Sequence, residues 1–210
     1  IVMRLVGSEM CIRDSANREK IAKLLRFTSS KSDTDSCSVS LMDYVGRKKA
    51  HQDKIYYLTG ESYSVIANSP YLEAFRKHDI EVLLMTDRID EWMMGYLTEF
   101  DGLNFQDISR GELDLEELSD SKAEKSDKDK SNQENENKTE KALCDRVKEL
   151  LDGKVDDVRT TQRLTDSPAC LVVGEHDMGE QMRKIMQAAG QSVPDTKPVL
   201  EINIEHPLVI

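Results

Sequence analysis

The 210-residue chain lacks basic segments: no run of lysines and arginines stands clear of neighbouring acidic residues, and the formal net charge is −11. Proteins that bind the phosphate backbone of nucleic acids usually present a basic stripe, so this composition argues against DNA or RNA as a partner. The chain also lacks an apolar run of the roughly 18 residues that a membrane-spanning helix needs, and its start shows no signal-peptide pattern. We therefore expect a cytoplasmic protein without membrane contact.

Cysteine is scarce and scattered. Cys11, Cys37, Cys144 and Cys170 lie far apart in the sequence, and none of them forms a C-x-x-C pair. This spacing excludes a zinc knuckle, a dithiol redox motif and a secreted disulfide framework. We expect all four side chains to be free thiols in a reducing cytosol.

Signals for catalysis are weak. The best candidate for a phosphate loop, residues 60–62, reads Gly-Glu-Ser and lacks both repeated glycines and a lysine. The run GESYS at residues 60–64 carries serine where the turn of a nucleophile elbow needs glycine. Glu175, His176 and Asp177 are possible metal ligands, but adjacent residues at a helix start diverge and more often complement the helix dipole. We expect no catalytic residue, no metal and no cofactor in this chain, and no enzyme activity.

Charged residues make up 33% of the chain and aromatic residues only 5%, so part of it is expected not to pack. Residues 119–140 contain one apolar residue, Ala123, which predicts a flexible linker; a solvated helix is an alternative for the linker's charged ends. The linker separates a unit at residues 16–118 from a unit at 141–210. Residues 1–15 resemble a translated adapter sequence, so we expect them to be non-native, with a real N-terminal strand as the alternative.

The upstream unit has the pattern of an α/β domain. Residues 54–59 and 80–86 are apolar enough for strands buried on both faces, and helical stretches lie between them. This order predicts a parallel βαβ unit. A third helix is expected at 88–97 and an edge strand at 100–108, with a turn at Asp101-Gly102.

Two further helices are expected before the first strand. Asn17 is a candidate cap for a helix whose apolar face carries Ile21, Leu24 and Leu25. Ser40 is a candidate cap for a short second helix.

The downstream unit has the pattern of an α+β fold. A helix with an apolar stripe is expected to end near Gly153, and strands are expected at 155–160, 169–173 and 199–204. Between the last two strands, Asp177 begins a helix that Gly190 ends. The chain stops within an apolar run, so we expect the sequence to be truncated.

Two apolar stripes on helices need an explanation. Trp92, Met93 and Met94 are adjacent around the third helix, so not all three can face a core, and exposed apolar surface usually marks a contact site. The second stripe carries residues at helical spacing after the linker. Its members are Met178, Met182, Ile185 and Met186. Periodicity alone favours a core role for this stripe, although several methionines would also give a deformable binding surface.

Six runs of the chain resemble the bacterial heat-shock protein 90 (high-temperature protein G) family, in order and across residues 16–210. They are ANREKIAKLLRF at 16–27, KIYY at 54–57, IEVL at 80–83, TDRIDEW at 86–92, EFDG at 99–102 and RLTDSP at 163–168. The resemblance implies a molecular chaperone of the stress response that acts on unfolded proteins. It also implies that residues 16–118 end the middle domain and that 141–210 begin the C-terminal dimerisation domain.

The resemblance implies site residues as well. It places Trp92 and Met93 on a client-binding surface, together with the stripe formed by Met178, Met182, Ile185 and Met186. Clients would be partly folded proteins, and co-chaperones are possible further partners. The family's ATPase domain and last dimer helices have no counterpart here, so ATP and Mg²⁺ belong to the full-length homodimeric parent and this fragment is expected to be monomeric.

One alternative of a different class is a small cytosolic α/β enzyme with its site at the strand ends near Thr59 and Thr86. It requires a deep pocket with convergent polar groups. A purely structural scaffold is a third hypothesis, which the sequence does not separate from the first.

Overall fold

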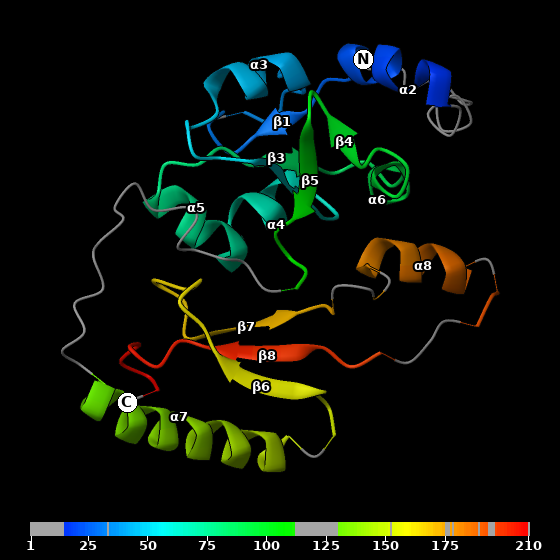
Figure 1. Ribbon diagram of the computed structural model, residues 1–210. Coiled ribbons are helices and arrows are strands. Elements are labelled where there is room, and N and C mark those ends of the chain that lie inside the picture. Colours follow the sequence, from blue (N-terminus) through cyan, green and yellow to red (C-terminus); the bar gives the residue numbers. More distant parts are fainter. Residues whose placement is uncertain are drawn as a thin grey trace.

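The computed structural model describes residues 15–32, 34–111, 130–151, 153–174, 177, 179–188, 190–192 and 196–209. Two open β-sheets lie in separate layers, each covered by helices (Figure 1). This arrangement confirms the α/β fold class. The domain boundaries proposed from the sequence remain a prediction. No helix within the described ranges is both long and apolar enough to cross a membrane.

The first sheet has the strand order β1-β3-β2-β5-β4. Its strands are β1 (Thr28–Ser29), β2 (Lys54–Thr59), β3 (Leu83–Met85), β4 (Glu99–Phe100) and β5 (Leu103–Asp107). The central strand β2 runs parallel to both β3 and β5, while β1 and β4 are antiparallel edge strands. The predicted parallel βαβ unit is therefore confirmed, with β2 and β3 as its strands.

Helices cover both faces of this sheet. They are α2 (Ser15–Leu24), α3 (Leu41–Arg47), α4 (Tyr63–Ala67), the 3₁₀ turn η1 (Pro70–Leu72), α5 (Glu73–Lys77) and α6 (Asp90–Met94). Successive residues of β2 point to opposite faces, so Ile55 packs with α2, α3 and α6 while Tyr56 packs with α4 and α5. Burial on both faces explains why β2 reads as an apolar run rather than an alternating one.

Several predicted boundaries differ from the structure. The helix predicted to start at Asn17 already begins at Ser15, so Asn17 is not its cap. Leu24, placed on the predicted apolar face, is 76% exposed, because Ala22 and Leu25 supply the buried side. Ser40 does cap α3: its hydroxyl accepts from the N–H of Asp43, whose carboxylate accepts from the N–H of Ser40.

The predicted edge strand at residues 100–108 is a hairpin instead. Strands β4 and β5 pair antiparallel around Asp101 and Gly102. Both turn residues have positive φ, at 52° and 76°, which is the geometry that two-residue hairpin loops need. The predicted turn is thus confirmed, but it reverses the chain between two short strands.

The second sheet has the order β6-β8-β7, with β6 (Asp157–Thr160), β7 (Ala169–Val172) and β8 (Val199–Ile202). The long helix α7 (Lys130–Leu150) packs along β6, and α8 (Glu180–Ala188) follows β7. Helix α7 includes residues 130–140, so that part of the predicted linker is helical, in line with the alternative for its charged ends. Residues 119–129 and 1–14 lie outside the described part of the chain.

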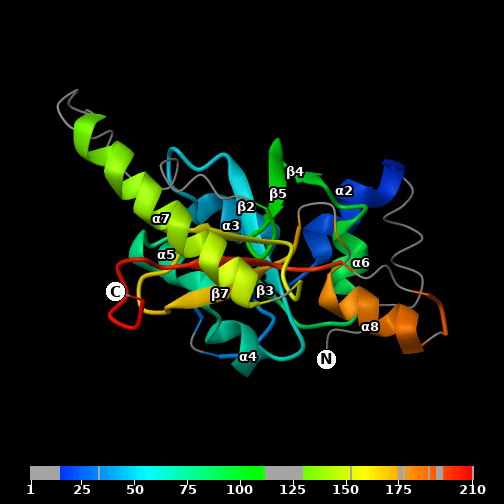
Figure 2. The same ribbon diagram turned by 90° about the horizontal axis from the view of Figure 1, so that it is seen from below.

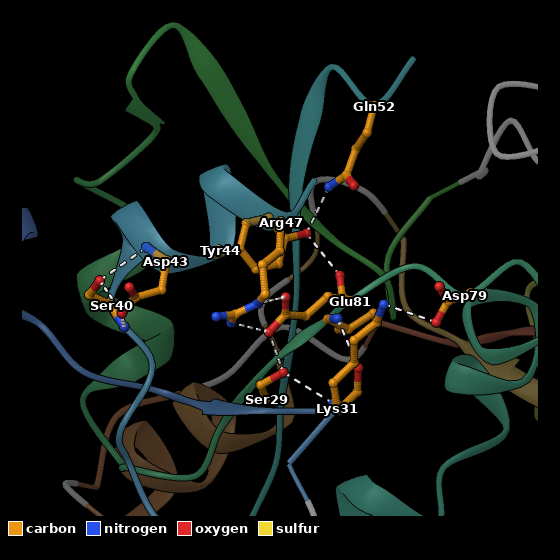
Figure 3. A network of polar contacts seen from close by, with 11 residues as sticks. Ser29, Lys31, Ser40, Asp43, Tyr44, Arg47, Gln52, Asp79 and Glu81 are labelled. Atoms are coloured by element: carbon orange, nitrogen blue, oxygen red, sulfur yellow. Dashed lines mark hydrogen bonds and ion pairs between the residues drawn. The ribbon is translucent and has the colours of Figure 1, made fainter. Parts of the chain in front are cut away.

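A buried polar network ties β1 and α3 to the segment before β3 (Figure 3). The Glu81 carboxylate accepts from Ser29 Oγ and pairs with the Arg47 guanidinium through two bonds of 2.7 and 3.0 Å. The Tyr44 hydroxyl donates to the Glu81 carbonyl at 2.8 Å and accepts from the Tyr56 N–H at 3.0 Å. This network gives the buried carboxylate and backbone groups their partners.

Tyr44→Phe tests this network. The change removes the hydroxyl that bonds to the Tyr56 N–H and the Glu81 carbonyl in the interior, so the free energy of unfolding should fall by about 1–3 kcal/mol. Urea denaturation of the whole chain measures the loss. Met42→Ala alters an exposed residue of the same helix and should stay within about 0.5 kcal/mol of the parent. A Tyr44→Phe protein as stable as Met42→Ala would show that the hydroxyl is dispensable.

Candidate functional site

Helix α8 lies beside α6, so residues far apart in the sequence meet at one end of the first sheet (Figures 1 and 2). The Glu91 carboxylate accepts a hydrogen bond of 3.0 Å from the N–H of Met182, in the first turn of α8. Its other oxygen lies 2.6 Å from Arg110 Nη2. The two predicted apolar stripes, on α6 and α8, are therefore brought together in space.

Trp92 is the exposed member of the α6 stripe. Its side chain is 43% exposed and lies edge-on to the ring of Tyr96, with centroids 6.0 Å apart. Met93, by contrast, is only 2% exposed and packs in the core under the first sheet with Met94. The expectation that Met93 contributes accessible surface is wrong, because the short helix can turn only one side to solvent.

The α8 stripe is partly accessible. Ile185 is 41% exposed, and Met182 and Met186 are half-buried. Met178 lies outside the described residues. The exposed apolar groups of the two stripes are thus Trp92 on α6 and Ile185 on α8, and Met182 and Met186 of α8 are half-buried. We call these four residues, on two neighbouring helices, the apolar face.

An open hollow of about 490 Å³ lies at the strand ends where the alternative enzyme site was expected. Its lining residues are Glu61, Thr86, Arg88, Lys184, Ile185 and Ala188. Glu61 and Lys184 pair with each other across it. The hollow is open to solvent, and no further feature of the residues that the structure describes supports the enzyme hypothesis.

The turn after β2 does not fit a nucleotide phosphate site. A Cβ at Gly60 would lie 2.1 Å from the Ile66 side chain, so this glycine permits close packing of α4. The next residue, Glu61, presents a carboxylate that would repel phosphate. The turn after β2 thus serves the packing of α4 against the strand, and no catalytic step is assigned to it.

The cysteines described by the structure are free thiols, as expected for Cys37, Cys144 and Cys170. Burial raises the pKa of Cys170 to about 12, which makes it an unreactive thiol at neutral pH. Within the described ranges, no group of three or more His, Cys, Asp or Glu side chains could hold a metal ion. Glu175 and His176 lie outside those ranges.

Polar contacts join the two sheets, and the hydrophobic periodicity of the sequence did not predict them. The Glu73 carboxylate at the start of α5 accepts from the N–H groups of Thr165, Asp166 and Ser167 at 2.7, 2.9 and 3.2 Å. The Ser167 hydroxyl donates to the same carboxylate. One side chain of the upstream unit thus fills a ring of donors in the downstream unit.

Arg163 forms a second joint and is almost completely buried. Its guanidinium donates to the carbonyls of Ile108 and Gly111 at 3.0 and 2.9 Å, and its Nε lies 3.4 Å from the Glu201 carboxylate. Nearby, Val173 forms a short parallel bridge with Arg110, beyond the end of β7. Both Arg163 and the residues that donate to Glu73 belong to the RLTDSP run at 163–168. This run was the one sequence feature singled out beforehand that contains residues of the two joints.

The Glu73 joint should weaken in acid. Burial opposes ionisation of Glu73, but the hydrogen bonds from Ser167 and the three N–H groups outweigh it and hold the pKa below its ordinary value of 4.5. A carboxyl whose pKa is lowered on folding stabilises the protein above its unfolded pKa, and this contribution is lost as pH falls through the folded pKa.

Glu73→Gln tests that expectation. The variant should unfold at lower urea concentration than the parent at about pH 6, and the gap should shrink as pH falls below about 4. The exposed Glu99→Gln on β4 serves as the control, with no such gap. A gap that stays constant across this pH range would contradict the assigned role of the carboxylate.

Comparison with known protein families identifies the family of the chain. Residues 8–210 match the family described as Hsp90 protein. The match includes the TDRIDEW and RLTDSP runs. It begins at residue 8, within residues 1–15, whose non-native origin stays a prediction. Since the match spans nearly the whole length, the chain belongs to the Hsp90 family of molecular chaperones.

Proposed function

We propose that this chain binds partly folded client proteins through the apolar face formed by Trp92, Met182, Ile185 and Met186. The observation that carries the proposal is that Trp92, the single tryptophan of the chain, is 43% exposed. It lies on α6, the helix beside α8. Large exposed aromatic groups usually mark contact sites.

The composition of the apolar face suits weak binding of many partners. Trp92 offers a wide, rigid surface, while methionine side chains are flexible and polarisable and adapt to different shapes. Charged residues stand next to the face, including Lys184 and Arg88 around the adjoining hollow. Such a mixture favours clients with exposed apolar segments without excluding those that also carry charge.

The finer features of the proposal rest on the sequence resemblance. The chain would be the end of the middle domain and the start of the C-terminal domain of a bacterial, cytoplasmic heat-shock protein 90. ATP with Mg²⁺ would act in another part of a homodimeric parent, and co-chaperones would be further partners. The fragment itself would neither hydrolyse ATP nor form a stable dimer.

Trp92→Ala tests the proposal. Binding of a destabilised client to the whole chain, measured by fluorescence anisotropy of a labelled client, should weaken by about tenfold, as for truncation of a central aromatic contact. Ile185→Ser should weaken it by a smaller factor of about three.

Leu150→Ala is the matched control. Leu150 is also an exposed apolar residue, but it is the last residue of α7, which packs along β6 of the second sheet, away from α6 and α8 (Figure 1). Its variant should bind client as the parent does. Equal affinities for the parent, Trp92→Ala and Ile185→Ser would contradict client binding at this face and favour a purely structural scaffold.

A further inference from the structure

The first turn of α8 obtains a hydrogen-bond acceptor from a different helix. The first N–H groups of any helix lack partners within it, and a side chain usually caps them from the preceding residue. Here the acceptor for the Met182 N–H is Glu91 of α6, which lies 91 residues earlier in the chain. The negative carboxylate also complements the positive end of the helix dipole.

Glu91 is itself held in place by Arg110. The two side chains form a 2.6 Å ion pair and are mostly buried. Arg110 also places Nε 3.0 Å from the Asp107 carboxylate and donates to the Asp177 carbonyl at 3.0 Å, just before α8. Arg110 therefore holds both the capping carboxylate and the backbone that leads into the helix.

Gly179 makes this approach possible. A Cβ at this position would lie 1.8 Å from Glu91 Oε1 and 2.4 Å from Arg110 Nη2. Both atoms belong to long side chains, but each is fixed by other bonds and cannot retreat without breaking the ion pair or the cap. The buried glycine is therefore a spatial requirement of the contact between α6 and α8.

We infer that Glu91, Arg110 and Gly179 are positioning residues that hold α8 beside Trp92 and so assemble the apolar face from two helices. We call these three residues the α8 clamp. The inference rests on the proposed function, since it explains how the parts of that binding face are kept together.

The position of the clamp has a direct effect on binding. Glu91 caps α8, and the next residue on α6 is Trp92, so one short helix carries both the cap and the main exposed anchor. With the clamp closed, a client meets Trp92 and Ile185 at a fixed separation and does not have to bear the cost of ordering α8. With the clamp open, the two contacts become independent and affinity should fall.

An ion pair of α8 outside the clamp is a suitable control. Lys184 pairs with Glu61, and both side chains are largely exposed. Exposed pairs of this kind contribute little, so Glu61→Gln should leave α8 docked. Like Glu91→Ala, this variant removes the charge of a glutamate that contacts α8, but Glu61 is not part of the clamp.

The test is a cycle of Glu91→Ala, Gly179→Ala and the double variant in the whole chain. Amide hydrogen exchange of residues 182–188 is measured without client, and client affinity is measured separately. Each single variant should speed exchange in α8 by about tenfold and weaken client binding by about fivefold. Amides of β2 in the same spectra show whether the rest of the chain stays folded.

The double variant gives the decisive comparison. Glu91→Ala removes the closest atoms that a Cβ at residue 179 would strike and frees Arg110 Nη2 from its ion pair, so Gly179→Ala should do less harm in this background than in the parent. Effects that simply add would show that the two residues act separately and would overturn the inference. Glu91→Gln keeps an acceptor but loses the charge, and should fall between the parent and Glu91→Ala.

The readouts separate this inference from the proposed function. Unchanged exchange in α8 for Glu91→Ala and Glu91→Gln would overturn the clamp, whatever the client assay shows. Faster exchange with unchanged client affinity would confirm that the clamp docks α8 but overturn its role in assembling the face. Loss of client binding in Trp92→Ala tests the face independently of either result.

Discussion

The buried guanidinium of Arg163 lies where the two sheets meet, and its bonds to residues of both units fix how the sheets are placed. It is 2% exposed, it faces a Glu201 carboxylate that is 3% exposed, and it donates to two carbonyls at the end of the first sheet. Glu201 also pairs with Arg159 at 2.7 Å, so the charge that depends on the pair is the buried guanidinium: removing Glu201 would leave it without its carboxylate, a change that typically costs about 3–5 kcal/mol. Replacing a buried ion pair by apolar residues of similar volume is often neutral, so the pair is a requirement of this arrangement rather than a source of net stability.

The contact between the two units differs in kind from the core of either one. Within the first sheet, two clusters of apolar side chains fill the space on the two faces. Between the sheets, Tyr71 packs against a small cluster around Leu164, and the remaining contacts described above are hydrogen bonds and ion pairs. Polar contacts require closely matched positions and exchange readily with water, which is typical of domains that move relative to each other.

Much of the local structure could be predicted from the sequence. The strands around Tyr56 and Leu83 were recognisable because both are buried on two faces, and the cap at Ser40 was recognisable because its partner is three residues away. The third helix was predicted too long: α6 covers Asp90–Met94 rather than 88–97. Its start is later because the Asp90 carboxylate accepts from the N–H of Asp87 and organises a turn before the helix. Met93 was misplaced because a five-residue helix has too little length for its spacing to show which side is buried.

The candidate site was predictable only in part. Trp92 and the α8 stripe were found from spacing and from resemblance, but the contacts that bring them together were not. Glu91 and Glu73 look like ordinary surface acids in the sequence, since their partners are backbone N–H groups more than ninety residues away. No periodicity reports a side chain that pairs with a distant backbone, and Gly179 reads as a mere helix-start residue until its neighbours are known.

The short bridge at Val173 has a consequence for the behaviour of the chain in a crowded solution. Strand β7 lies at the edge of its sheet, and an uncovered edge is a template for pairing with another chain. The backbone of Ser109 and Gly111 bonds to Val173 just past the end of that strand, and the Tyr71 hydroxyl donates to the Leu171 carbonyl within it. The upstream unit therefore acts as a cover for β7, and separation of the two units would expose a strand edge capable of self-association.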